Sequence, residues 1–200
     1  MSRRRALQLG LGAGGVLVLG WLGYSWLRFP SDRTPEGAYL RVVSAVNRDR
    51  PEALFAYLET DAQHACYSVG KYRRQARDRV LADYPEPERS ELAERYRLFA
   101  EATDGEDVFA LYARSEGWLD RLRRDLSGVA RVEEVGARAS VETVRGTRYS
   151  FRRRENGIWG LTTFTAPLVA EGEKAARDLQ VIERAADDYA RAKRRAPDGG

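Results

Sequence analysis

Residues 6–27 form an uninterrupted run of 22 side chains without a charge, and this run constrains the architecture of the chain most strongly. A helix needs about 20 predominantly apolar residues to cross the hydrocarbon core of a bilayer. Aromatic residues gather at the far end of the run, at Trp21, Tyr24 and Trp26, and amphipathic rings of this kind favour the membrane interface. The run therefore predicts a transmembrane anchor.

The basic residues around the run predict its orientation. Three arginines occupy positions 3–5, whereas only Arg28 and Arg33 follow the run closely. Because positively charged flanks stay in the cytoplasm, we expect a single-pass protein of a bacterial inner membrane, with a cytoplasmic N-terminus and a periplasmic or otherwise extracytoplasmic domain. The expected segments are a cytoplasmic basic region at 1–5, an anchor at 6–27, a linker at 28–33, an exported domain at 34–195 and a flexible tail at 196–200.

A cleaved signal peptide would have a similar basic start and apolar core. However, no A-x-A cleavage site follows the core, and the Gly-Tyr-Ser triplet at positions 23–25 is a poor substitute. The segment therefore fits an uncleaved anchor better, although both interpretations export the same domain.

The glycines inside the run spell G-x-G-x-x-G at positions 10–15. A dinucleotide-binding site with this fingerprint needs a buried strand before it and a helix after it, and a chain start with three adjacent arginines is no buried strand. Gly10 and Gly14 also form a G-x-x-x-G pair, which lets two membrane helices approach closely. The high glycine content of membrane helices explains the same residues.

The charge distribution argues against a nucleic-acid partner. The chain has 34 basic and 30 acidic residues, and the five basic residues and one acidic residue before Thr34 leave 29 of each sign in the remainder. The excess therefore belongs to the anchor and its flanks. Cys66 is the one cysteine, so the domain has no internal disulfide and must be stabilised by its core.

The apolar spacing after Thr34 predicts an α+β domain, because helices come first and strands follow without alternation. Residues 61–69 fit either a helix or a strand. Four strands are expected, and the last two form a hairpin that turns at Asn156 and Gly157. The expected helices cover residues 34–46, 51–58, 71–84, 88–102, 105–126 with a break near Gly117, and 170–195. The expected strands cover 129–135, 137–144, 149–154 and 158–165, and the first two alternate apolar and polar residues as half-buried strands do.

Two stretches resemble the NTF2-like superfamily. They are the helical opening from Thr34-Pro35-Glu36-Gly37-Ala38 to Leu58, and the closing sequence Glu155-Asn156-Gly157-Ile158-Trp159-Gly160-Leu161. The resemblance implies a curved sheet around helices that enclose a pocket. The superfamily includes enzymes, binding proteins and scaffolds, so the resemblance alone does not assign a function.

A ligand site is expected near Tyr57, Asp61, His64 and Tyr67. The NTF2-like resemblance implies this role for Asp61 with Tyr57 or Tyr67, because enzymes of that superfamily pair an aspartate with a tyrosine or a second acid. His64 and Cys66 do not form a local dyad, since their side chains lie on opposite faces of a strand and about 200° apart on a helix. With one histidine and one cysteine, we expect no catalytic residue, no metal site and no cofactor.

A second candidate is an anionic-ligand surface formed by Arg148, Arg152, Arg154 and Trp159. The simpler interpretation is the outer face of a sheet, with Tyr149 and Phe151 toward the core. With a two-residue turn at Asn156 and Gly157, Arg154 lies opposite Trp159 and stacks on it.

The sequence thus predicts a membrane-anchored envelope protein in a binding or accessory role. One alternative is an NTF2-like small-molecule binder or enzyme with its pocket near Asp61, Tyr57 and Tyr67. Another is an oligomeric envelope component, joined to a second copy or to another envelope protein through Gly10, Gly14 and the last helix.

Overall fold

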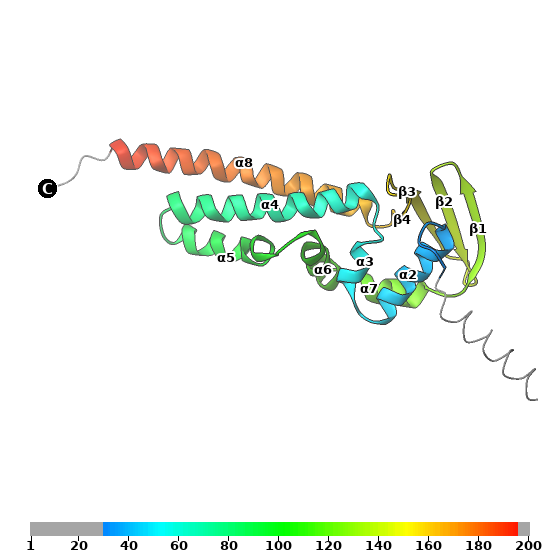
Figure 1. Cartoon of the computed structure of the whole chain (residues 1–200). Helices are drawn as coiled ribbons and strands as arrows, with labels where there is room; N and C mark the ends of the chain where they lie inside the picture. The colour runs from blue at the N-terminus through cyan, green and yellow to red at the C-terminus, as the bar shows by residue number, and fades with distance from the viewer. Residues whose placement is uncertain (1–29, 196–200) are drawn as a thin grey trace, which may run out of the picture.

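The computed structural model describes residues 30–195, in which helices precede an antiparallel sheet and a last helix follows it (Figure 1). The predicted α+β class is confirmed for these residues. The predicted anchor and tail lie outside them, and no helix within residues 30–195 is long and apolar enough to cross a membrane. The helices are α2 Pro35–Asn47, α3 Pro51–Phe55, α4 Thr60–Asp83, α5 Glu88–Glu101, α6 Gly105–Ser115, α7 Trp118–Asp125 and α8 Thr165–Arg195.

The sheet is a four-stranded meander in the order β1-β2-β3-β4. Its inner face carries buried residues such as Val141, Phe151 and Trp159, and α2 packs on this face against β1, β2 and β4. Arg148 and Arg152 lie on the opposite, exposed face. The strands are β1 Val129–Val135, β2 Arg138–Thr143, β3 Arg148–Arg153 and β4 Trp159–Leu161.

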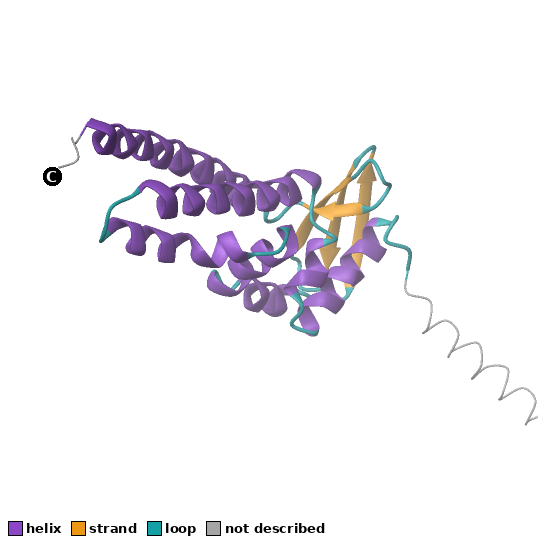
Figure 2. Cartoon of the chain, turned by 60° about the vertical axis from the view of Figure 1, so that its left-hand side comes forward, coloured by secondary structure: helices purple, strands orange, loops and turns teal. Residues whose placement is uncertain are grey.

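Helices α4, α5 and α8 run away from the sheet as an arm (Figures 1 and 2). The first half of α4 and of α8 packs in the main core, whereas the second half of each contributes to a separate apolar cluster with α5. Arg73 of α4 forms an ion pair of 2.6 Å with Asp178 of α8 and lies over the ring of Tyr96 of α5. The three helices of the arm are therefore joined by polar contacts as well as by apolar packing.

The helix starts follow from local chemistry. The Thr34 hydroxyl accepts a hydrogen bond from the Gly37 N–H, and Pro35 occupies the first position of α2, where a missing N–H costs nothing. Asp104 accepts from the amides of Glu106 and Asp107 at the start of α6. Side-chain oxygens at these positions satisfy amides that the helix itself leaves unpaired.

Three helix boundaries differ from the sequence prediction. Helix α3 ends at Phe55 rather than at residue 58. Residues 61–69 belong to α4, which is continuous over 24 residues. Helix α8 begins at Thr165 rather than at 170, and Pro167 lies in its first turn instead of ending the hairpin. Proline is tolerated there because the first amides of a helix have no intrahelical partner. The last strand is correspondingly short.

The hairpin turn between β3 and β4 also differs. The Gly157 N–H donates to the Arg154 carbonyl, and Arg154 pairs with Ile158. Gly157 has a positive φ of 82° but Asn156 does not, so this is not the predicted two-residue turn, which needs a positive φ at both positions. The extra loop residue shifts the register by one. Arg153, not Arg154, therefore lies opposite Trp159 and places its guanidinium 5.7 Å from the ring centroid.

Strand β1 was expected to be half-buried, but every residue after Val129 in it is exposed. At the other edge of the sheet, the segment before α4 extends the pairing. The Glu59 N–H donates to the Leu161 carbonyl and the Leu161 N–H donates to the Tyr57 carbonyl, which forms a parallel bridge between Leu58 and Leu161. The two edges of the sheet are therefore unlike: one is covered and the other, β1, is open.

Candidate ligand pocket

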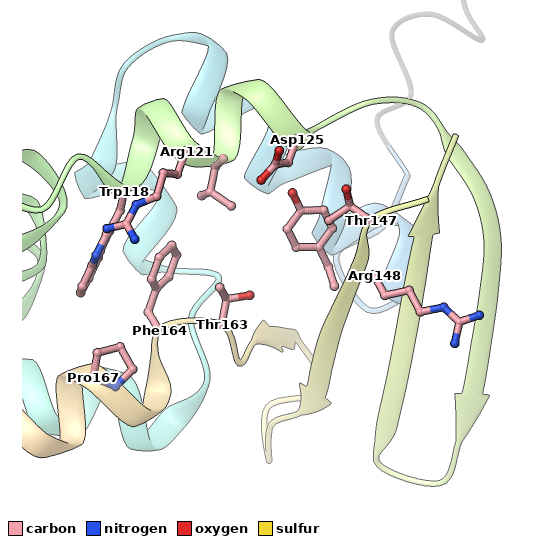
Figure 3. Close-up of a pocket in the computed structure, with 10 residues that line it drawn as sticks. Trp118, Arg121, Asp125, Thr147, Arg148, Thr163, Phe164 and Pro167 are labelled. Atoms are coloured by element: carbon pink, nitrogen blue, oxygen red, sulfur yellow. The ribbon is translucent and has the colours of Figure 1, made fainter. Parts of the chain in front are cut away.

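A pocket of about 370 Å³ opens between α7, β3 and the start of α8 (Figure 3). Its volume lies in the range of about 300–1,000 Å³ that is typical of small-molecule sites. The lining residues are Trp118, Arg121, Leu122 and Asp125 of α7, Thr147, Arg148 and Tyr149 of β3 and the turn before it, and Thr163, Phe164 and Pro167 around the start of α8.

One end of the pocket is aromatic. The rings of Trp118 and Phe164 stack with their centroids 4.7 Å apart and their planes 19° apart, and Phe109 of α6 contacts both from the core side. Both rings of the stack are buried, so the surrounding core fixes their positions. Such a rigid wall suits an apolar or planar group.

The other end is polar and holds a buried hydroxyl without a partner. Tyr149 is 5% exposed, and its hydroxyl oxygen has no hydrogen-bond partner among residues 30–195. A buried polar group in this state costs about 1–3 kcal/mol. Burial, followed by the charges of Tyr39 and Asp125, raises the pKa of Tyr149 to about 12, so the phenol stays protonated at neutral pH.

Asp125 brings a carboxylate to the same end. Figure 3 shows Asp125 and Thr147 there, with Trp118, Phe164 and Pro167 at the opposite end. Asp125 ends α7 and forms neither an ion pair nor a side-chain hydrogen bond within residues 30–195. Its carboxylate is therefore free to accept hydrogen bonds from a bound molecule.

The two arginines of the pocket differ in where their side chains lie, since the Arg121 guanidinium lies beside Trp118 (Figure 3). Arg121 donates to the Glu116 carbonyl at 2.7 Å. The Arg148 side chain points away from the pocket over the outer face of the sheet (Figure 3), where it pairs with Glu142 at 3.1 Å. Within the described chain, neither Asp125 nor Arg121 forms an ion pair, whereas the charge of Arg148 is paired with that of Glu142.

The backbone explains why α7 contributes so many of these residues. Gly117 adopts a left-handed conformation with φ of 63°, which separates α6 from α7 and begins the new helix at Trp118. Positions 118, 122 and 125 are then three or four residues apart and share one face of the helix. That face turns Trp118, Leu122 and Asp125 toward β3 together.

The predicted ligand residues are distributed over different surfaces. Asp61 and His64, one turn apart on α4, line a shallow groove of about 290 Å³ between α4 and α8. Tyr67 lies elsewhere, edge-on to Phe55 at 5.7 Å, and lines a different pocket beside Cys66. Tyr57 lies half-buried after α3 and packs against the core. The structure therefore brings Asp61 and His64 together, without Tyr57 or Tyr67.

The predicted arginines are paired within the chain. Arg152 contacts the Glu59 carboxylate at 2.6 Å, and the Arg154 guanidinium donates to the Ala56 carbonyl at 2.8 Å. Together with the Arg148–Glu142 pair, these contacts use the guanidinium groups of all three arginines. Arg148 and Arg152 are charge-compensated on the outer sheet face, whereas Arg154 follows β3 and bonds a backbone carbonyl. Trp159 is buried on the inner face, so the predicted anionic-ligand surface of these four residues is not formed.

Residues 30–195 contain no group of three or more His, Cys, Asp or Glu side chains placed to hold a metal ion. Cys66 is fully buried, and burial raises the pKa of its thiol to about 12. His64 lies exposed on another side of α4. The two residues therefore do not form a thiolate–imidazole pair.

Sequence reasoning missed Trp118, Asp125, Tyr149 and Phe164 as pocket residues. They come from three segments that are far apart in the chain, so no spacing motif connects them. The available signals were an aromatic residue directly after Gly117 and another shortly before Pro167, which mark element boundaries rather than a site.

Other hollows lack the chemistry of this pocket. The one between α3 and α7 is lined by Asp49, Asp120 and Arg123, and these three charges already pair with one another at 2.7–3.0 Å. Comparison of the chain with protein-family models, with curated proteins and with solved structures returned no match.

Proposed function

We propose that this chain is a membrane-anchored protein of the bacterial envelope whose exported domain binds a small amphipathic molecule between Trp118 and Tyr149. The unpartnered, buried Tyr149 hydroxyl carries the proposal, because native proteins rarely leave such a group without a partner. A ligand that supplies the missing hydrogen bond would remove this cost on binding.

The two ends of the pocket define the ligand class. The stacked rings of Trp118 and Phe164 suit an apolar ring or a short chain. The Asp125 carboxylate is acceptor-only when ionised, so the polar end of the ligand should carry donors. A protonated amine meets both conditions, since it donates to Asp125 and to the oxygen of Tyr149.

The sequence supports the placement at a membrane. Residues 6–27 carry no charge, and the arginines at 3–5 precede them, which favours a cytoplasmic N-terminus. The full-length protein should resist extraction from membranes at alkaline pH, and protease added to intact spheroplasts should digest its domain. Complete release by alkali would contradict the anchor without bearing on the pocket.

The ligand class is tested with a matched pair of probes on the full-length protein in lipid nanodiscs. Phenethylamine carries the ring and an ammonium group, whereas hydrocinnamate carries the same ring and a carboxylate. We expect ligand-detected NMR to report binding of the amine only, with empty nanodiscs correcting for partition into lipid. Equal binding of both probes, or binding of neither, would overturn the assignment.

Variants of the polar end locate the bound probe. Asp125→Asn and Tyr149→Phe should each weaken phenethylamine binding about tenfold, the effect of losing one hydrogen bond to a charged group. Tyr67→Phe is the control, because Tyr67 is exposed on α4 away from the pocket. Unchanged affinity in both pocket variants would place the probe elsewhere.

A further inference from the structure

Strand β1 presents an open edge. It pairs with β2 on one side, and within residues 30–195 no strand pairs with its other side; Figure 1 shows it at the outer margin of the sheet. Val135 is 80% exposed and Val132 is 38% exposed. An edge of this kind is a template for another strand, and β1 contains neither proline nor lysine to block it.

The hydrogen bonds of the neighbouring strands show which backbone groups face the open edge. The Arg153 N–H donates to the Ala137 carbonyl and the Thr143 N–H donates to the Thr147 carbonyl. In an antiparallel ladder the bonding direction alternates from one residue to the next. The odd-numbered residues of β2 therefore bond to β3, and the even-numbered ones bond to β1.

The register between β1 and β2 extends this alternation to β1. Arg138, Ser140 and Glu142 pair with Val135, Glu133 and Arg131 respectively. These three residues of β1 use their N–H and C=O groups toward β2. The N–H and C=O groups of Val132 and Glu134 consequently point toward the open edge, in the plane of the sheet. A partner strand must form its hydrogen bonds with these two residues.

The side chains favour a second copy of the same strand. Consider two antiparallel β1 strands related by a two-fold axis at Val132, which we call pairing about Val132. Val132 then lies opposite its counterpart, and Arg131 of each strand lies opposite Glu133 of the other. Pairing about Glu133 or Glu134 would instead place like charges directly opposite, which is destabilising. Of the registers that the backbone groups allow in this segment, one alone is electrostatically complementary.

We propose that β1 pairs with β1 of a second copy about Val132, joining two four-stranded sheets into one continuous sheet. Arg131 and Glu133 already lie on the same face of the strand, 2.8 Å apart, and both are about half exposed or more, so the pairing extends an existing ion pair into a four-charge network. The register shift between Val129 and Arg131 is a bulge that limits the paired segment at its start.

The symmetry is compatible with two copies in one bilayer. A two-fold axis perpendicular to the sheet keeps the helix-covered faces of both copies on one side. The start of the described chain lies on that face, since Nε1 of the inward-facing Trp159 donates to the Arg33 carbonyl at 3.1 Å. Both N-terminal segments would therefore leave the joined sheet on the same side. The proposal does not depend on the ligand pocket.

Disulfide trapping in native membranes tests the register with the full-length chain. In the proposed pair the Cα atoms of residue 132 are about 5.5 Å apart, within the span of a disulfide. Val132→Cys should therefore give an oxidant-dependent dimer. Val135→Cys in the same strand should not, because its counterpart lies six residues away, about 20 Å along the strand. The native Cys66 is buried and should not form an intermolecular disulfide. The chain without an added cysteine should therefore run as a monomer on a non-reducing gel.

Charge exchange in the Val132→Cys chain separates strand pairing from pairing through the membrane segment. Arg131→Glu should lower the trapped fraction about fivefold, as expected for like charges opposite each other at two places, and Arg131→Glu with Glu133→Arg should restore it. No dimer with Val132→Cys, equal trapping with Val135→Cys, or failure of the exchange to restore the dimer would each overturn the proposal.

Discussion

At the scale of single residues, we expect the Tyr149 hydroxyl to lower the stability of the folded protein. Because the group is buried without a partner, Tyr149→Phe should raise the free energy of unfolding by about 1 kcal/mol. Tyr39→Phe is the matched control, since the Tyr39 hydroxyl donates to the Ser127 carbonyl at 2.7 Å, and its loss should lower the free energy by about the same amount. Urea denaturation measures both, and a loss in both variants would contradict this account of Tyr149.

The second prediction at this scale concerns the reactivity of Cys66. Burial raises the pKa of its thiol from 9.0 to about 12, and the thiolate is the form that reacts. A thiol-specific chromogenic disulfide at pH 8 should therefore leave the folded protein unlabelled and label it fully in urea. Rapid labelling of the folded protein would show that the first half of α4 opens readily.

The same shift has a defined effect on pH dependence. The folded state holds the Cys66 proton more tightly than the unfolded state, so the thiol favours folding below about pH 9 and this contribution is lost as the pH rises toward 12. Cys66→Ala removes this contribution, so the free energy of unfolding of the variant should fall less between pH 9 and pH 11 than that of the parent chain. The slope of the urea midpoint between pH 9 and pH 11 measures it.

At the scale of elements, two glycines provide opposite tests of packing. A Cβ on Gly160 would lie 2.6 Å from the Leu58 carbonyl oxygen and 2.7 Å from the Glu59 Cα, so Gly160→Ala should cost about 1–3 kcal/mol of stability. A Cβ on Gly172 would lie at an ordinary 3.7 Å from Ala65, and Gly172→Ala should stabilise α8 by about 0.5–1 kcal/mol. Thermal unfolding measures both changes, and the same sign for both would contradict the packing described for these contacts.

Elements whose signals are local were predictable from the sequence. Thr34 with Pro35 marks the start of α2, and Gly117 marks the break between α6 and α7, because each residue acts through the backbone within one turn. The predicted register of the hairpin at Asn156 was wrong by one residue. Asn156 and Gly157 fit two turn types, and the backbone conformation of Asn156 decides between them.

Contacts between distant segments were not predictable. The bridge from Leu58 to Leu161 joins residues about a hundred positions apart, and the pocket joins α7, β3 and the start of α8. Neither leaves a spacing pattern in one sequence. Asp61 and His64 are close in the chain and so belong to one local pattern, whereas Tyr149 and Phe164 face the same pocket only after the sheet has folded onto the helices.

At the scale of the whole molecule, two long helices connect a compact body to an arm. Leu168 and Ala175 of α8 lie in the main core, whereas Ile182 and Ala186 lie in the arm cluster. With 31 residues, α8 extends about 46 Å at a rise of 1.5 Å per residue. Its last residues lie at the far end of the arm, remote from the sheet where the described chain begins (Figure 1).

This shape predicts how the molecule stands on a membrane. If residues 6–27 anchor the chain, Asp32 lies near the bilayer, whereas Arg195 ends a helix that is about 46 Å long and leads away from the sheet. In the full-length protein in liposomes, a donor dye on Asp32→Cys should transfer energy strongly to acceptor-labelled lipid, and the same dye on Arg195→Cys should transfer weakly. Because Cys66 is buried, it should not compete for the dye, and the parent chain provides the background. Equal transfer from both positions would mean that the arm lies along the bilayer, and the exposed faces of α5 and α8 would then contact lipid headgroups rather than solvent.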